Sequence, residues 1–470
     1  MRGFRGIVTL ISFTAVPLFA APQPDSHVDR IAADIIVTAA PVYVPRAELR
    51  GEERFPKGAH LLLVRDGKAE PLIPEFAASA DANVYFDGSR VIFSGKQKPG
   101  DPWQIWELSL KDHSLRHVLT TASDAERPLY LPAGRVVFGL RTPGGFRLDS
   151  NDDGHPLLST PLNPTTGPGE MKLAYTRGSS FPDDVLQDGR VLFESNYPLG
   201  NGQAAEMFLV YPDGSGVESY RCDHGVARWA GEQSSSGDVV FTHGDGLARF
   251  TSPLAHEVRI AAPPGQYAGS IAEAPSGEWL VSVRQLAGMH YVLKLWKPGT
   301  STMRTELAES TQDLVEPVLA APRTMPTRFP SGLHPWDYAN LLALDARLSR
   351  DGVLKGTPAR VRLEAQDADG KAFIMGTAPV EQDGSFFIQV PGDRPLRISL
   401  LDAKGSVLRQ EHGWFWSRGG EQRICVGCHT GPERSSDNRV PAVLLRTTTP
   451  VALTAVQPAS SAHRVASGGR

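Results

Sequence analysis

The stretch "NVYFDGSRVIFSG", residues 83–95, decides the fold of this chain. It places an Asp-Gly turn, Asp87-Gly88, just before the β-branched and aromatic run Val91-Ile92-Phe93. A glycine turn between two short runs of this kind is typical of adjacent antiparallel strands. The stretch therefore predicts two strands joined by a tight turn, with little sign of helical periodicity around it.

The same pattern returns along the chain, which indicates a repeat. The further copies are "PLYLPAGRVVFGL" from Pro128, "DDVLQDGRVLFES" from Asp183, "EQSSSGDVVFTHG" from Glu232 and "IAEAPSGEWLVSV" from Ile271. Their turn glycines recur at roughly 40–55 residues, the period of propeller blades. A sixth unit combines "AHLLLVRDGKAEPLI", from Ala59, with "LVEPVLAAP", from Leu314. A ring closed by strands from both ends leaves no exposed sheet edge.

The predicted fold class is therefore all-β: a β-propeller, of six blades, followed by a small β-sandwich-like domain. We assign residues 59–325 to the propeller and 326–446 to the second domain, where Asp-Gly turns join short alternating strands such as Phe386–Val390. Residues 21–58 form a lead segment. Residues 447–470 are low in bulky side chains, so we expect a disordered tail.

The first 20 residues are typical of a secretory signal peptide. Arg2 and Arg5 precede the apolar stretch Ile7–Ala20, which is too short to span a bilayer comfortably, and Ala20-Ala21 supply small residues for cleavage. No later stretch is long and apolar enough for a membrane helix. We therefore expect an exported protein in the periplasm. The net charge of −4 does not favour a nucleic-acid partner.

The functional signal lies in "RICVGCHTG", where Cys425 and Cys428 precede His429. C-x-x-C-H is the attachment signature of c-type haem. Two thiols one short turn apart can each form a thioether with one porphyrin, and the adjacent histidine can supply the proximal iron ligand. A redox dithiol or half of a zinc site are the alternatives. No βαβ context and no second CxxC accompany the motif, so we predict one covalent haem c.

The second domain resembles a known family. The stretches "GTAPVEQDGSFFIQVPGDRPLRISLLDAKG" from Gly376, "WFWSRGGEQRICVGCHTGPE" from Trp414 and "NRVPAVLLR" from Asn438 resemble the haem-bearing middle domain of hydrazine synthase alpha subunit and its bacterial relatives. The repeated units before it resemble TolB-like propellers. The resemblance implies a propeller joined to a β-rich domain, up to about Arg446, with haem attached at Cys425 and Cys428.

Two departures from the hydrazine-forming branch matter. That branch carries a second c-type haem in a further domain, and this chain has no further CxxCH. The branch also uses a tyrosine soon after the motif as iron ligand and leaves the motif histidine to zinc, together with a propeller cysteine. Here Glu433 stands four residues past His429, and no tyrosine follows Tyr338. Cys222 and His429 are then a candidate zinc pair, but we take His429 as the haem ligand and do not expect hydrazine synthesis.

Other candidate ligands are single residues or partial motifs. Met375, His412 and His334 lie in the haem domain and are candidates for the sixth iron position, although a lone histidine or methionine is usually packed or solvated. The tryptophans and phenylalanine of residues 414–416 either pack in the core or form a wall beside the cofactor.

A separate segment matches the start of a calcium loop. In "DSNDDGH" the residues Asp149, Asn151 and Asp153 stand at ligand spacing, but the acid expected at position twelve is Thr160. A hairpin turn rich in Asp, Asn and Gly explains the same letters. Calcium therefore stays an alternative to a plain turn.

Three functions remain open from the sequence. The first is an exported monohaem c-type cytochrome-like redox protein that uses its propeller as a docking or pocket-forming platform for a periplasmic redox partner. The second is a haem enzyme acting on a small nitrogen or oxygen species at an open iron site. The third is a non-catalytic propeller binding module. No catalytic triad or P-loop stands out in the sequence.

Overall fold

Strands make up nearly all the regular structure, which confirms the all-β prediction. The computed structural model describes residue 31 and residues 33–141, 156–163, 169–175, 178–196, 206–221, 226–253, 255–305, 311–349, 354–367, 370–411, 413–427 and 439–455. Within these ranges the helices are two short ones, η1 (Glu48–Arg50) and α1 (Ala442–Arg446). None of them is long or apolar enough to cross a membrane. The expected signal peptide lies outside the described residues.

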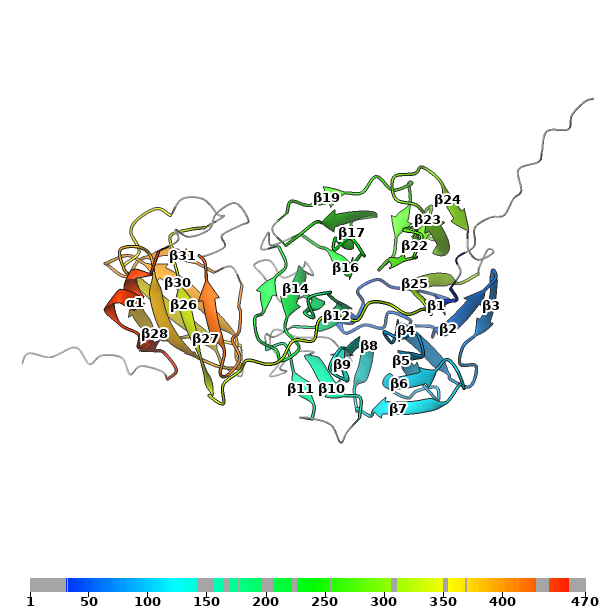
Figure 1. Ribbon diagram of the computed structural model, residues 1–470, viewed down its shortest axis with the longest axis horizontal. Helices are drawn as coiled ribbons and strands as arrows, with labels where there is room; N and C mark the ends of the chain where they lie inside the picture. The colour runs from blue at the N-terminus through cyan, green and yellow to red at the C-terminus, as the bar shows by residue number, and fades with distance from the viewer. Residues whose placement is uncertain are drawn as a thin grey trace, which may run out of the picture. The chain divides into compact units, whose positions relative to one another are not determined.

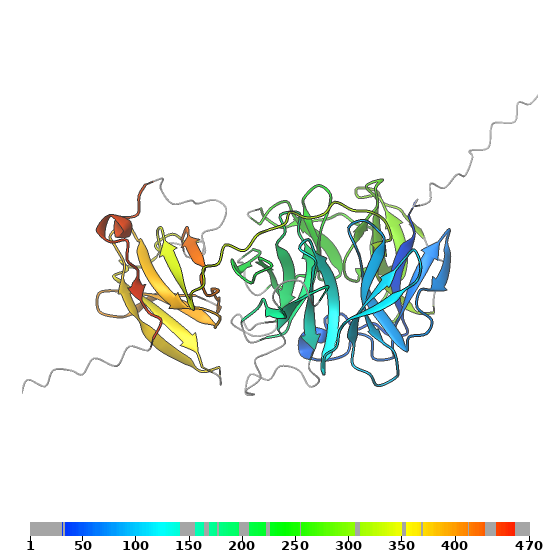
Figure 2. The ribbon, with the colours of Figure 1, turned by 60° about the horizontal axis from the view of Figure 1, so that its bottom comes forward.

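Six antiparallel sheets surround a common centre in the part of the chain before residue 321 (Figures 1 and 2). The first holds β25 (Asp313–Leu319), β1 (Ile35–Ala40), β2 (His60–Arg65) and β3 (Lys68–Pro71). The second holds β4 (Ala78–Val84), β5 (Arg90–Lys96), β6 (Gln104–Ser109) and β7 (Leu115–Leu119). The third holds β8 (Asp124–Leu131), β9 (Arg135–Arg141), β10 (Leu157–Pro161) and β11 (Met171–Lys172).

The other three sheets repeat the same order along the chain. The fourth holds β12 (Ser180–Val185), β13 (Val191–Ser195), β14 (Glu206–Val210) and β15 (Glu218–Ser219). The fifth holds β16 (Trp229–Gln233), β17 (Val239–His243), β18 (Gly246–Phe250) and β19 (Val258–Arg259). The sixth holds β20 (Gln266–Tyr267), β21 (Ala272–Glu273), β22 (Trp279–Arg284), β23 (Val292–Trp296) and β24 (Met303–Thr305). In each of the second to fifth sheets, strands that follow one another along the chain lie side by side, as in propeller blades. In the sixth sheet β20 and β21 both pair with β22.

The first sheet joins strands from both ends of the ring, as the sequence predicts. β25 pairs with β1, and β1 pairs with β2. However, β1 lies inside residues 21–58, so the ring begins earlier than the predicted boundary at Ala59. All six residues of β1, "IIVTAA", are buried, and a strand buried on both faces lacks the alternation that marks a half-exposed strand.

Aspartate side chains in the turns accept hydrogen bonds from the turn backbone in both parts of the chain. In the Asp-Gly-Ser turn after β4, Ser89 N donates to Asp87 Oδ1 at 2.9 Å, and Gly88 has a φ of 76°. In the turn before β29 (Phe386–Pro391), Ser385 N donates to Asp383 Oδ1 at 3.0 Å. An aspartate that caps its own turn beside a glycine in the left-handed region fixes a tight reversal.

The second part is a two-sheet sandwich, as predicted (Figure 2). One sheet has the order β32 (Gln422–Cys425), β26 (Tyr338–Ala343), β29, β33 (Val451–Ala452). The other has the order β28 (Ala372–Pro379), β27 (Arg360–Gln366), β30 (Leu396–Leu401), β31 (Val407–Gln410). Both sheets contribute to one apolar core, which includes Leu341, Leu363 and Phe386.

The end of the sandwich corrects one prediction. The sequence predicts a disordered tail from residue 447, but β33 pairs in parallel with β29 and Leu453 is fully buried in the sandwich core. A short strand with one apolar anchor carries too little local signal to be separated from a tail. The remainder of the predicted tail, residues 456–470, lies outside the described residues.

Candidate functional site

The innermost strands of the ring carry β-bulges at equivalent positions. Strand pairing shifts within β4, β8, β12, β16 and the β25–β1 pair. The residues at these shifts are Asp81, Arg127, Asp183, Ala230 and Glu316. In the sixth sheet the inner strand is interrupted between β20 and β21. A bulge turns a side chain away from the regular alternation, and bulges are common beside functional sites.

The backbone at these bulges is strained. Asp81, Arg127, Ala230 and Glu316 have φ values of 61°, 56°, 53° and 55°, in a region that residues other than glycine rarely adopt. Each such residue costs roughly 1–3 kcal/mol and persists only where its surroundings hold it in place. The strained backbone therefore lowers the stability of the ring, and it directs these residues toward the centre.

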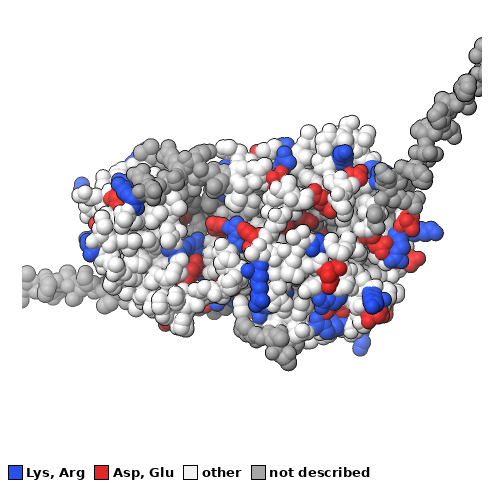
Figure 3. Space-filling view, viewed as in Figure 1, with Lys and Arg blue, Asp and Glu red and all other residues white. Residues whose placement is uncertain are grey.

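The bulged residues line a central cavity of about 240 Å³. Its charged lining is mostly acidic, with eight carboxylates against three arginines. The carboxylates are Glu48, Asp81, Asp183, Asp184, Glu194, Glu232, Glu273 and Glu316, and the arginines are Arg46, Arg127 and Arg323. The outer face behaves differently, since acidic and basic side chains intermingle over the face in Figure 3. The excess of negative charge is thus a property of the cavity.

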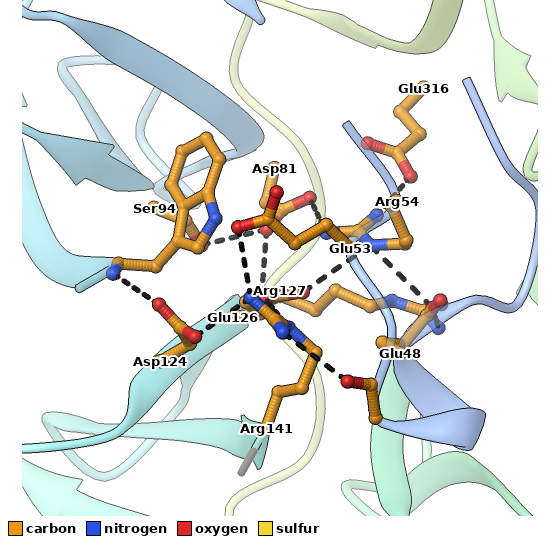
Figure 4. Close-up of polar contacts among 12 residues, drawn as sticks. Glu48, Glu53, Arg54, Asp81, Ser94, Asp124, Glu126, Arg127, Arg141 and Glu316 are labelled. Carbon is orange, nitrogen blue, oxygen red and sulfur yellow. Dashed lines mark hydrogen bonds and ion pairs between the residues drawn. The ribbon is translucent and has the colours of Figure 1, made fainter. Parts of the chain in front are cut away.

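The lead segment contributes to this site. Arg54 is 2 % exposed, donates from Nη1 to Glu316 Oε1 at 2.6 Å, and pairs with Asp81 (Figure 4). Its Nε also lies 3.7 Å from Glu48 Oε1 and 3.5 Å from Glu126 Oε2. Residues assigned from the sequence to a lead segment therefore reach the middle of the ring.

A second arginine, Arg127, joins the carboxylates of neighbouring sheets. It pairs with Asp183 and Glu194, and its Nη1 lies 3.2 Å from Glu48 Oε1. Each arginine contacts more carboxylates than its single charge can balance: Arg54 contacts four, and Arg127 contacts three. Within the described part of the chain, four lining carboxylates keep a buried second oxygen without a hydrogen-bond partner: Glu48 Oε2, Asp183 Oδ2, Glu194 Oε2 and Glu316 Oε2.

Burial changes the ionisation of this cluster. It raises the pKa of Glu126 and of Glu316 to about 7, against the pull of the Arg54 charge. Burial also raises the pKa of Asp183, with the nearby Glu194 charge acting in the same direction, and that of Glu232, with Asp184 acting likewise. Glu316 in the cavity and its neighbour Glu126 are therefore poised to exchange protons near neutral pH.

The motifs and repeats of the sequence do not predict this cavity. The available signal was a charged residue inside an otherwise apolar inner strand, six or seven residues before a turn glycine, as with Asp81 and Gly88 or Asp183 and Gly189. A charge in a strand is usually read as a solvent-facing residue. Only the bulge turns it inward.

Of the predicted haem residues, the structure describes Cys425. It is the last residue of β32 and pairs with Ala343 of β26, and Leu344 N donates to its carbonyl at 2.9 Å. Its side chain is half-buried against the sandwich core. Burial raises the pKa of the Cys425 thiol, with the nearby Arg423 charge acting in the opposite direction. The backbone at the start of the motif is thus held in a sheet.

The other predicted ligands lie outside the described residues. These are Cys428, His429, the zinc candidate Cys222, the calcium candidates Asp149, Asn151 and Asp153, and His412. Among the described residues no group of three or more His, Cys, Asp or Glu side chains is arranged to hold a metal ion. The zinc and calcium predictions therefore stay predictions.

The candidates for the sixth iron position make other contacts. Met375 is 2 % exposed and belongs to the sandwich core. His334 stacks on Trp336 with ring centroids 4.5 Å apart, and its backbone N donates to Gly420 O at 3.2 Å. In the aromatic run before the motif, Trp416 packs in a buried cluster, and the Arg397 guanidinium lies 4.6 Å over the ring of Trp414. The wall beside a cofactor stays a prediction.

The segment just before the motif contacts the ring of sheets. Trp416 Nε1 donates to Gly214 O at 3.0 Å, and Arg423 Nη2 donates to Val217 O at 2.6 Å. Arg423 Nη1 also donates to Trp416 O at 3.2 Å. Arg423 therefore links β32, which ends in Cys425, to the segment between β14 and β15.

The fold and the motif define the class of this protein. It is a β-propeller followed by a β-sandwich whose edge strand ends in the first cysteine of CxxCH. Residues 346–430 match the family model described as hydrazine synthase alpha subunit middle domain. Hydrazine synthase subunit alpha of Kuenenia stuttgartiensis is 29% identical over 87 residues, 18% of this chain and 11% of that protein. The chain thus matches a small fraction of that relative's length.

Solved structures extend the likeness of the fold. A hydrazine synthase structure from Kuenenia stuttgartiensis has a TM-score of 0.72 and 17% identity, and the match covers 88% of this chain and 71% of that one. TolB from Acinetobacter baumannii is more distant, with a TM-score of 0.45, 13% identity and coverage of 62% and 67% of the two chains. The chain is thus similar to hydrazine synthase alpha subunit in sequence over residues 346–430 and to a hydrazine synthase structure in fold over most of its length.

Proposed function

We propose that this chain is an exported, periplasmic, monohaem c-type cytochrome-like redox protein. One haem c is attached covalently by Cys425 and Cys428, and His429 is the proximal iron ligand. The observation that carries this proposal is the CxxCH motif at the end of β32, inside the segment that matches the hydrazine synthase alpha middle domain. The haem supplies one-electron chemistry when it is bound.

The described surroundings of Cys425 fit a large apolar group. The neighbouring Ile424 is 65% exposed and Val426 is 40% exposed. A porphyrin attached at Cys425 would cover these two apolar side chains. The raised pKa of the Cys425 thiol also disfavours the dithiol alternative, because a redox-active cysteine needs a lowered thiol pKa.

The residues that flank the rest of the motif are anchored at one end of one sheet. Cys425 pairs with Ala343, and Ala343 pairs with Phe386 on its other side. After the motif, Val443 N donates at 3.0 Å to the hydroxyl of Ser385, the residue just before Phe386. Cys425 and Val443, which lie on either side of residues 428–438, are therefore both tied to the same end of β26 and β29.

The remaining parts of the proposal follow from this placement. We take the six sheets as six blades of a closed propeller that serves as a docking or pocket-forming platform. The similarity to hydrazine synthase subunit alpha, a subunit by name, supports protein partners for this chain, and we propose a periplasmic redox protein among them. The mixed surface charge in Figure 3 gives no support to a nucleic-acid partner.

A second candidate function is a haem enzyme that acts on a small nitrogen or oxygen species at an open iron site. The observation that favours it is that Met375 is committed to the sandwich core and His334 to a stack with Trp336. An iron with a vacant sixth position binds small ligands, whereas a filled one favours electron transfer.

The test is an absorption spectrum of the full chain, exported in a host that matures c-type cytochromes, reduced with dithionite before and after carbon monoxide. Covalent haem that persists after denaturation is the expected result, and its absence overturns the proposal. The double variant Cys425→Ala/Cys428→Ala should lose covalent attachment, because no thiol of the motif is left to form a thioether, while the control Cys222→Ala should keep it. A spectrum unchanged by carbon monoxide favours electron transfer, and a shifted one favours the enzyme. Zinc lost in Cys222→Ala would instead support the Cys222–His429 pair.

A further inference from the structure

We propose that the central cavity of the propeller binds a small organic cation with several N–H donors, such as a diamine or a guanidinium compound. This site is separate from the haem motif and does not depend on it. It is built from the inner strands β4, β8, β12 and β25 together with the lead segment that carries Glu48.

The charge of the ligand follows from the charged side chains that line the cavity. Eight carboxylates and three arginines face the cavity, as set out above. Burial makes an uncompensated carboxylate costly, so a buried acidic excess is relieved by protons or by a bound cation. An anionic ligand would add to the excess. A neutral ligand would leave it unchanged.

The hydrogen-bonding character follows from the unpartnered oxygens. Glu194 is 1% exposed and Glu48 is 2% exposed, and the side chain of Asp183 is fully buried. In the described part of the chain, Glu194 Oε2, Glu48 Oε2 and Asp183 Oδ2 accept no hydrogen bond. In the ionised form these oxygens can only accept, so a cation that donates hydrogen bonds to them favours that form over the protonated one. Charge-assisted N–H donors are the strongest match for such oxygens.

The size and the apolar lining indicate an organic cation over a bare metal ion. A cavity of about 240 Å³ is several times the share of liquid volume taken by one water, about 30 Å³. Tyr43, Leu129, Trp229 and Val318 contribute aromatic and aliphatic surface to it. No three metal-ligating side chains are already grouped among the described residues. A hydrocarbon body with cationic ends uses both kinds of surface.

The test is isothermal titration calorimetry of the full chain with 1,4-diaminobutane and, separately, guanidinium chloride at low ionic strength. Saturable binding of either cation is expected, with no binding of inorganic phosphate. The variant Glu194→Gln should weaken binding by at least about 10-fold, the loss typical of one charge-assisted hydrogen bond. The control Glu218→Gln should bind as the wild type does, because that side chain is 49% exposed, pairs with Arg190, and lies outside the cavity.

A second measurement separates ligand binding from a folding defect. Glu316, whose pKa is about 7, faces Arg54, Asp81, Arg127 and Glu48, so cation binding should displace a proton from this group. Affinity should rise by up to about 10-fold from pH 6 to pH 8, as one group with a pKa near 7 ionises. The heat of binding should also depend on the ionisation enthalpy of the buffer.

Three results overturn the proposal. The first is no binding of either organic cation by folded wild-type protein. The second is saturable binding of calcium or magnesium with no response to the organic cations, which would mean a metal site. The third is equal weakening by Glu194→Gln and the Glu218→Gln control, with both variants folded by circular dichroism.

Discussion

Replacing Arg54 by methionine should destabilise the propeller strongly. The side chain is 2 % exposed, and four buried or mostly buried carboxylates converge on its guanidinium: Glu48, Asp81, Glu126 and Glu316. Methionine keeps most of the length and apolar stem but removes the charge. Because buried carboxylates would lose their counter-charge, we expect the free energy of unfolding at pH 8 to fall by about 3–5 kcal/mol.

The assay is differential scanning calorimetry of the full chain. For a domain of the propeller's size, a loss of this magnitude lowers Tm by roughly 5–8 °C. The matched control is Arg65→Met in β2, the strand that follows Arg54 along the chain. Arg65 pairs with Asp34 at 2.5 Å, but its side chain is 64% exposed. Exposed ion pairs contribute little, so the Tm of this variant should stay close to that of the wild type.

The loss of stability in Arg54→Met should depend on pH. The pKa of Glu126 and of Glu316 is about 7, so both carboxyls are mostly protonated at pH 5 and need the Arg54 charge less. The Arg54→Met loss should therefore be smaller at pH 5 than at pH 8. A loss of equal size at both pH values, or one no larger than that of Arg65→Met, would refute the reasoning.

Three further predictions concern stability. The pKa of Glu316 in the folded protein is about 7, above its ordinary 4.5. The stabilisation of the fold by this group is therefore fully present below pH 4.5 and is lost as pH rises through about 7. The Tm of the wild type should fall from pH 5 to pH 8, and the fall should be smaller in Glu316→Gln. Gly139→Ala places a Cβ against the Phe181 ring and should cost about 1–3 kcal/mol in urea unfolding, whereas Gly246→Ala, which meets open space, should cost less. Trp416→Phe keeps an aromatic ring but removes the indole N–H, so the buried Gly214 carbonyl loses its donor. The free energy of unfolding should fall by about 1–3 kcal/mol, and proteolysis between the propeller and the sandwich should become faster.

The sequence by itself determined the repeating unit. The Asp-Gly turns act locally, since Asp87 bonds the backbone of Ser89 two residues on, so the letters alone predict the reversal. The repeat of these turns predicts the ring of sheets, and CxxCH predicts the haem site from spacing alone. These features depend on residues that are close in the chain, and close neighbours are what a sequence pattern records.

Only the tertiary structure decided the central cavity and the two strands at the domain ends. Arg54 and Glu316 are 262 residues apart, and nothing in either local stretch indicates that their charges meet. Alternation along the strand does not predict that the Asp81 side chain faces the centre of the ring. The bulge at Asp81 turns it inward. The strand Ile35–Ala40 likewise forms because Asp313–Leu319 returns to pair with it. The physical reason is that buried charge is tolerated only where opposite charge lies nearby in space, and folding alone brings those groups together.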